Sequence, residues 1–413
     1  MRLNSSNSFS GTNSPQMPTR RELLKLAGYG VGSLLLGGCR QTPDATVEPS
    51  GETVMRFPGK VPMRVLNDRP PCLETPWQYF RDDLTSNEAF YVRWHLQMIP
   101  TEVELRTWRL KIGGHVNQPL ELSMDELRRM ESVSVVAVNQ CSGNSRGLFE
   151  PRMPGAQWGN GAMGNARWTG VRLTDLLRRA GVKAGTVEVS FAGLDKGGLA
   201  TIPDFIKSLP IDVAQQTHVM VAYEMNGQLL PMLNGFPTRL VVPGWFGTYW
   251  VKALTDIMVL DRTFEGFWMR PAYRIPTTNN GYETPDRLAE QTVPISRMRV
   301  RSFFVTPEND AQIPLGRPYP IDGIAFDGGD GIQRVQFSAN GGGTWQDATL
   351  GVDHGCYSFR RWHAEWNPTE RGEFHLQVKA TSSTSGETQP ATASWNRSGY
   401  LRNVIEEIRV QVV

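Results

Sequence analysis

The chain reads Val138-Asn139-Gln140-Cys141-Ser142-Gly143-Asn144-Ser145-Arg146-Gly147 where an apolar run ends, and this segment is its most informative part. The β-branched run before it, 133–138, predicts a strand, and the Gly/Asn/Ser-rich continuation predicts a turn. Cys141 is therefore expected on a loop that a rigid strand holds. A lone cysteine in such a place is more often a small buried residue than a reactive group. The nearby Arg146 favours a reactive site.

A second polar segment lies close downstream, Gly155-Ala156-Gln157-Trp158-Gly159-Asn160-Gly161-Ala162-Met163-Gly164-Asn165-Ala166-Arg167-Trp168. An ordinary core does not need this much glycine, asparagine and tryptophan, and such a segment lets the backbone approach a large polar ligand. Around it, strand-like runs such as 108–112 alternate with amphipathic runs such as 122–130 and 173–180. These alternations predict a mixed α+β domain over residues 68–292.

A different pattern begins at residue 293 and continues to residue 413. Short strand-like runs are separated by turns such as Asp327-Gly328-Gly329-Asp330-Gly331. The runs lie at 298–305, 319–326, 332–338, 374–380 and 405–413. Regular short strands with glycine-rich turns predict a β-sandwich.

Charge and cysteine content exclude several classes of protein. The 413 residues contain 43 Lys and Arg against 41 Asp and Glu, a net charge of +2. We therefore expect no nucleic-acid partner. The four cysteines include no Cys-x-x-Cys pair, so zinc ribbons, thioredoxin sites and covalently attached c-type haem lack their ligands.

The N-terminal region has the features of an export signal. Thr19-Arg20-Arg21-Glu22-Leu23-Leu24-Lys25 precedes a short apolar run, which predicts a twin-arginine signal over residues 1–39 and a periplasmic location. Leu36-Gly37-Gly38-Cys39 resembles a lipoprotein processing box, and two interpretations of Cys39 stay open: a lipid-anchored mature N-terminus, or a chance cysteine near a cleavage site. Residues 40–67, rich in Pro, Thr, Glu and Gly, predict a flexible tether.

From about Asn87 onward, the chain resembles the sulfite oxidase family of molybdenum enzymes. The resemblance rests on spaced motifs in the family's order. They are Cys141-Ser142-Gly143-Asn144-x-Arg146, Ala166-Arg167-Trp168-x-Gly170-x-Arg172-Leu173, Tyr223-Glu224-Met225-Asn226-Gly227, Asn234-Gly235-Phe236-Pro237-x-Arg239, Val251-Lys252 and Trp395-Asn396-x-x-Gly399. The resemblance implies an α+β molybdopterin-binding domain followed by an immunoglobulin-like β-sandwich that forms a homodimer. It also implies molybdenum and molybdopterin as cofactors.

The resemblance assigns roles to particular residues. Cys141 would be the thiolate ligand of molybdenum, a soft ligand suited to the metal. Arg146 and Arg93 would bind an oxyanion substrate through parallel donors, and Tyr273 would hydrogen-bond the reacting centre or pass a proton. The pterin would be held by His95, Ser142, Asn234, Arg239 and Lys252, although animal relatives carry His at the position of Asn234.

These assignments predict an exported enzyme that oxidises sulfite to sulfate and passes electrons to a c-type cytochrome. Within the family, the alternative is a sulfane dehydrogenase subunit of a thiosulfate-oxidising complex. Outside it, the alternative is a non-catalytic exported β-sandwich binding protein that uses its tryptophans.

Overall fold

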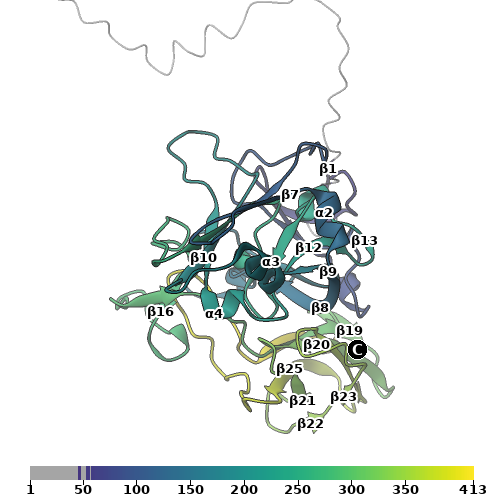
Figure 1. Cartoon of the computed structure of the whole chain (residues 1–413). Helices are drawn as coiled ribbons and strands as arrows, with labels where there is room; N and C mark the ends of the chain where they lie inside the picture. Colours follow the sequence, from purple (N-terminus) through teal and green to yellow (C-terminus); the bar gives the residue numbers. More distant parts are fainter. Residues whose placement is uncertain (1–44, 48–52, 56) are drawn as a thin grey trace, which may run out of the picture. The chain divides into compact units, whose positions relative to one another are not determined.

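The computed structural model describes residues 45–47, 53–55 and 57–413, which belong to the unit Pro43–Val413 (Figure 1). The predicted export signal, with Cys39, lies outside the described residues. Within the described ranges, no helix is both long and apolar enough to cross a membrane. The mixed α+β prediction is confirmed, because strands dominate and the helices are few and short.

A small antiparallel sheet contains the first described strands. Its order is β1 (Ala45–Val47), β2 (Thr53–Met55), β3 (Met63–Asp68), β4 (Pro71–Glu74) and β5 (Val92–Arg93). Residues 63–67 fall within the predicted tether, yet in the structure they belong to β3, which pairs with β2 and β4. Met63 is buried in an apolar cluster with Leu73 and Trp94, which explains why this segment packs on the domain.

A second sheet forms one wall of the catalytic region. Its order is β11 (Ile206–Pro210), β10 (Glu188–Gly193), β15 (Leu254–Leu260), β6 (Leu110–Gly114) and β7 (Leu120–Leu122). The β15 and β6 strands run parallel, whereas the other neighbours are antiparallel. The short helix α4 (Ile211–Ala214) follows β11.

A third sheet delivers the cysteine loop. Its order is β13 (Gln228–Leu229), β12 (Met220–Met225), β9 (Met163–Arg172) and β8 (Ser132–Gln140), and β14 (Arg239–Val241) also pairs with β12. β8 and β9 stay in register to the pair Gln140↔Met163, so Cys141 follows directly at the end of a long ladder. At Gly170, a Cβ would lie 2.1 Å from the Val221 carbonyl oxygen, so only glycine permits this approach of β9 to β12.

Two helices cover the sheets where the amphipathic pattern predicts them. α2 (Met124–Arg129) begins with a capping box between Ser123 and Glu126. α3 (Leu173–Ala180) has the predicted bounds and buries Leu173, Leu176, Leu177 and Ala180 on one face. Single 3₁₀ turns lie between the longer elements: η1 (Trp77–Phe80), η2 (Arg146–Leu148), η3 (Met232–Asn234), η4 (Gly247–Tyr249) and η5 (Asn279–Gly281).

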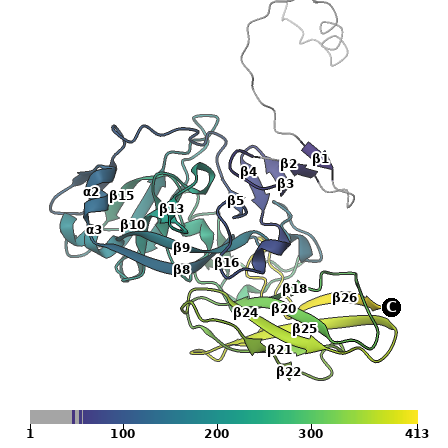
Figure 2. The ribbon, with the colours of Figure 1, turned by 90° about the vertical axis from the view of Figure 1, so that its right-hand side faces the viewer.

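The C-terminal part is a sandwich of two sheets, which follow the ribbon β16 (Arg274–Pro276) and β17 (Thr292–Pro294) (Figure 2). One sheet has the order β18 (Arg301–Thr306), β20 (Tyr319–Phe326), β24 (Arg360–Trp366) and β23 (Thr349–Leu350). The other has the order β19 (Ala311–Ile313), β26 (Glu406–Val412), β25 (Gly372–Ser382), β21 (Ile332–Ser338) and β22 (Gln346–Asp347). The sandwich prediction is confirmed, and the strands expected at 319–326 and 332–338 have those bounds.

The sandwich packs on the catalytic region through a shared core. Phe303, Phe326 and Tyr400 belong to the same buried cluster as the catalytic sheets. Trp395 Nε1 also donates a hydrogen bond to the Pro151 carbonyl oxygen at 2.8 Å. The segment between β25 and β26 therefore returns to the catalytic region and helps to build the site.

Candidate active site

The loop that carries Cys141 is rigid. The Cys141 amide donates to the Ala162 carbonyl oxygen at 2.9 Å, and the Asn144 amide donates back to the Cys141 carbonyl oxygen at 3.0 Å. The Asn144 side chain bonds Gln140 Oε1 and the Ala162 amide. Ser145 completes the turn in the left-handed region, at φ 68°. Cys141 is 9% exposed, so its thiol is held in place at the edge of a cavity.

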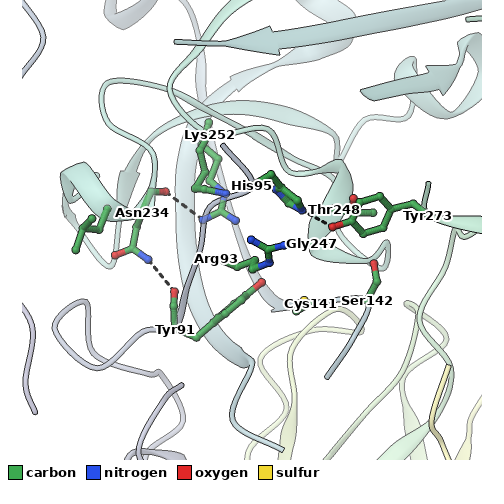
Figure 3. Close-up of a pocket in the computed structure, with 12 residues that line it drawn as sticks. Tyr91, Arg93, His95, Cys141, Ser142, Asn234, Gly247, Thr248, Lys252 and Tyr273 are labelled. Atoms are coloured by element: carbon green, nitrogen blue, oxygen red, sulfur yellow. Dashed lines mark hydrogen bonds between the residues drawn. The ribbon is translucent and has the colours of Figure 1, made fainter. Parts of the chain in front are cut away.

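A pocket of about 380 Å³, partly open to solvent, lies in front of this cysteine. Figure 3 shows the residues that line it. Most of the predicted site residues meet there, although they come from distant parts of the chain. The lining residues are Tyr91, Arg93, His95, Cys141, Ser142, Leu233, Asn234, Arg239, Gly247, Thr248, Lys252 and Tyr273.

Three of these residues come from one extended segment. Tyr91, Arg93 and His95 alternate with the buried Val92 and Trp94, so strand geometry turns all three toward the pocket. Tyr91 was not among the predicted site residues, but this alternation is the signal that identifies it. Its hydroxyl hydrogen-bonds Asn139 at the end of β8, which ties the segment to the cysteine strand.

His95 and Tyr273 form a hydrogen-bonded pair in the pocket wall (Figure 3). The imidazole stacks on Phe205 at 3.9 Å between centroids, and burial together with nearby cations holds the pKa of His95 well below its usual value. Burial raises the pKa of the Tyr273 hydroxyl, so this group remains a phenol. His95 is therefore a neutral ring, and Tyr273 retains its proton for hydrogen bonding.

Tyr273 also has an unusual backbone. Its φ is 58°, in the left-handed region that a bulky residue rarely adopts. Its ring stacks on Tyr400 at 5.7 Å with an interplanar angle of 5°. Such strain is maintained only where the surroundings over-determine it, and it clusters at functional sites.

Cations line the opposite side of the pocket. The buried Arg239 donates from Nη1 to the Asn234 carbonyl oxygen at 3.1 Å and from Nη2 to Asn139 Oδ1 at 3.2 Å. Burial lowers the pKa of Arg239 to about 10 and that of Lys252 to about 7. Lys60 donates to Asn234 Oδ1 at 2.7 Å, and burial lowers its pKa to about 7 as well. Desolvation is the main cause of these lowered pKa values, and the nearby carboxylates of Glu88 and Asp195 offset it only in part.

Lys207 adds a further buried charge from β11. It is fully buried, it donates to the Trp268 carbonyl oxygen at 2.7 Å, and its ammonium lies 4.9 Å from the centre of the Tyr273 ring. No salt bridge among the described residues includes Lys60, Arg93, Lys207, Arg239 or Lys252. A cluster of buried and half-buried cations outside any of these salt bridges favours an anionic ligand.

Unpartnered polar atoms support the same conclusion. Within the described part of the chain, Asn139 Nδ2, Ser142 Oγ, Arg239 Nε and Thr248 Oγ1 are buried and have no hydrogen-bond partner. Ser142, Arg239 and Thr248 line the pocket, and Asn139 bonds Tyr91, which does. Buried polar groups are normally paired, so these atoms point to a ligand. The cations, the free donors and the Cys141 thiol together fit a phosphorylated, metal-bearing cofactor such as molybdopterin with molybdenum.

The structure places two predicted residues less directly than the others. Asn234 lines the pocket, but its amide is engaged by Lys60 and donates to the Tyr91 carbonyl oxygen at 3.2 Å. Arg146 lies beside the pocket and is absent from the residues that line it. It donates from Nε to the Ser398 carbonyl oxygen at 3.0 Å, and its guanidinium lies 5.3 Å from the centre of the Tyr400 ring.

Sequence reasoning missed several residues of the site. Lys60 falls in the predicted tether, and Lys207 falls in a strand with no motif. Thr248 lies between the fourth motif and Val251-Lys252, in a stretch without a pattern of its own. Tyr400 follows the C-terminal Trp-Asn-x-x-Gly motif directly, and that position was the available signal for it.

The chain matches models of known protein families over most of its described length. Residues 95–268 match the oxidoreductase molybdopterin binding domain, and residues 292–413 match the Mo-co oxidoreductase dimerisation domain. Among similar proteins, mitochondrial sulfite oxidase of Rattus norvegicus is 32% identical over 412 residues, which cover 96% of this chain and 73% of that protein. Sulfite oxidase of Gallus gallus is 34% identical, with 91% of this chain and 83% of that protein covered.

Solved structures include one similar fold. The sulfane dehydrogenase SoxCD from Paracoccus pantotrophus superposes with a TM-score of 0.72 and 26% sequence identity. The match covers 84% of this chain and 85% of that chain.

Proposed function

We propose, because this chain belongs to the sulfite oxidase family of molybdopterin enzymes, that it oxidises sulfite to sulfate in the pocket beside Cys141. The chain is an oxidoreductase that acts on sulfur compounds and uses molybdopterin-bound molybdenum. The interpretation as a non-catalytic binding protein is wrong, since the matched model is that of an oxidoreductase domain. We choose an anionic substrate because Arg93 lines the pocket and has no carboxylate partner among the described residues.

The residues divide between cofactor and substrate. Cys141 would supply the thiolate ligand, and Arg239 and Lys252 would hold the phosphate and pyran side of the pterin. The bound cofactor supplies oxygen-atom transfer and accepts two electrons. Ser142 and Thr248 would donate from their unpartnered hydroxyls.

The chain's own groups prepare the substrate and handle protons. Arg93 would hold the sulfite oxygens through parallel donors, next to Cys141 (Figure 3). The reaction SO₃²⁻ + H₂O → SO₄²⁻ + 2 e⁻ + 2 H⁺ releases two protons. Tyr273 keeps its phenolic proton at neutral pH and would orient the substrate through that hydroxyl, which the neutral His95 holds in place through their hydrogen bond.

We propose a c-type cytochrome in the periplasm as the one-electron acceptor. Two features of the sequence support this: the twin-arginine pattern at 19–25 and the lack of a c-type haem motif in the sequence. Cys39 would add a lipid anchor if the processing box is used. The dimerisation domain at 292–413 supports a homodimer.

A sulfane dehydrogenase subunit is the second candidate, and the superposition on SoxCD favours it. Assays of substrate oxidation by purified enzyme with a measured molybdenum content distinguish the two candidate functions. We expect cytochrome c reduction with sulfite and little with thiosulfate or a protein-bound sulfane. Turnover with the sulfane alone would establish the second candidate, and absence of molybdenum and pterin would contradict both.

A further inference from the structure

A second, smaller cavity lies behind the cysteine loop, where the catalytic region meets the sandwich. The catalytic region contributes Gln140, Ser142, Asn144 and Phe246, and the C-terminal part contributes Arg299, Arg301, Leu401, Arg402 and Asn403. Of these residues, Ser142 alone among the described ones also lines the larger pocket. The cavity is thus a separate space on the far side of the loop that carries Cys141.

The charges around this cavity do not balance. Arg301 Nη2 and Arg402 Nη1 both donate to the same oxygen, Glu406 Oε1, at 2.5 and 2.7 Å. Their side chains are 3% and 12% exposed. Arg299 has its own partner, Glu387, at 3.1 Å. Two buried guanidinium groups therefore share one carboxylate, which leaves one positive charge without a counter-ion.

Two polar atoms of the lining residues have no partner. Within residues 57–413, Arg301 Nε and Arg402 Nε are buried and make no hydrogen bond. Both atoms are obligate donors. A buried donor that makes no hydrogen bond is unfavourable. The cavity therefore presents donors and excess positive charge to whatever fills it.

The guest must accept hydrogen bonds and be small. A water molecule would need acceptors for its own protons, whereas the arginine groups offer only donors and Gln140 Oε1 already accepts from Asn144 and Arg301. The cavity is smaller than the pocket in front of Cys141, so a compact monatomic anion suits it better than a tetrahedral oxyanion with four oxygen atoms. We propose that this cavity binds one halide-class anion, chloride under ordinary conditions, which joins the cysteine loop to the sandwich.

Crystallography of the holoenzyme tests the site directly. Crystals soaked in bromide should show an anomalous peak within hydrogen-bonding distance of Arg301 Nε and Arg402 Nε. A bromide-soaked crystal with water in the cavity and no anomalous signal would overturn the proposal. This measurement needs no variant, so it does not depend on whether a changed arginine still folds.

Thermal unfolding tests the energetic role. We expect the Tm of the holoenzyme to rise and saturate as chloride or bromide replaces gluconate at constant ionic strength. Arg402→Gln should move the midpoint of that rise to about 10- to 100-fold higher chloride, because a hydrogen bond to a charged group is lost. The control is Arg334→Gln, a 51% exposed arginine paired with Asp347, which should leave the midpoint unchanged.

Two results would refute the stabilising role of the bound anion. A Tm that is the same in chloride and gluconate would exclude a bound halide. Stabilisation by sulfate without stabilisation by bromide would show that the class of anion is wrong. Neither result depends on which sulfur compound the enzyme oxidises.

Discussion

Replacing Arg93 with glutamine tests the substrate side of the pocket most directly. Glutamine keeps polarity but removes the positive charge and the two parallel N–H donors. Arg93 has no carboxylate partner among the described residues and lies in the pocket beside Cys141 (Figure 3). The substitution therefore removes charge that is available to the substrate and not charge that the fold already neutralises.

The expected magnitude follows from the lost contact. A hydrogen bond to a charged group contributes about 1.5–3 kcal/mol. At about 1.4 kcal/mol for each factor of ten, the KM for sulfite should rise about 10- to 150-fold. Arg93→Lys should fall between wild type and Arg93→Gln, because the ammonium keeps the charge and loses the planar fork.

The assay is sulfite-dependent reduction of cytochrome c or ferricyanide, normalised to bound molybdenum. Arg270→Gln serves as the control, because Arg270 is 61% exposed, pairs with Glu265 and lies three residues from Tyr273. An exposed ion pair contributes about 0.2–1 kcal/mol, so the control should shift KM less than about fivefold. A KM for Arg93→Gln that equals wild type at full molybdenum content would refute the reasoning. Loss of molybdenum instead would place Arg93 on the cofactor.

Four further outcomes are expected. Cys141→Ser should abolish turnover, because a hydroxyl is a hard ligand that cannot replace a thiolate. The variant should retain most of its pterin, measured by pterin fluorescence. Turnover at the wild-type rate would show that Cys141 is not the ligand. Lys252→Met should reduce molybdenum bound per chain, because a cation that faces the phosphate is lost; full occupancy would contradict that role. Cofactor-free protein should be more stable to urea at pH 9 than at pH 7. Burial lowers the pKa of Lys60 and Lys207 to about 7 from 10.5, so the unfolded chain binds more protons in this window and stability rises with pH; a flat profile would refute it. Light scattering at micromolar concentration should give the mass of a dimer, and a monomer would count against the homodimer.

Local patterns in the sequence were enough to predict much of the architecture. Alternation and turn residues placed strands at 319–326 and 332–338, and the amphipathic run at 173–180 predicted a helix with its observed bounds. These features depend on neighbours within a few residues, so sequence order carries them. The motif around Cys141 likewise predicted a strand followed by a turn, as β8 and its loop confirm.

The contacts between side chains in the pocket could not be predicted from local patterns. Arg93, His95, Arg239, Lys252 and Tyr273 were predicted from the family resemblance, and the structure brings all of them to one cavity. The motifs did not show how these side chains contact each other, because side-chain contacts arise from packing between segments far apart in the chain. The hydrogen bond between His95 and Tyr273 spans 178 positions.

Tertiary structure alone revealed the unpaired positive charge. Lys60 and Lys207 look like ordinary lysines in the sequence, and only the fold shows that both are desolvated and lie outside the salt bridges of the described residues. The same holds for Arg301 and Arg402, whose shared Glu406 leaves an excess charge behind the cysteine loop. The sequence by itself determined the elements and the type of chemistry, because both depend on local pattern and residue identity. Burial and charge balance depend on which segments exclude water from one another, and only the folded chain decides that.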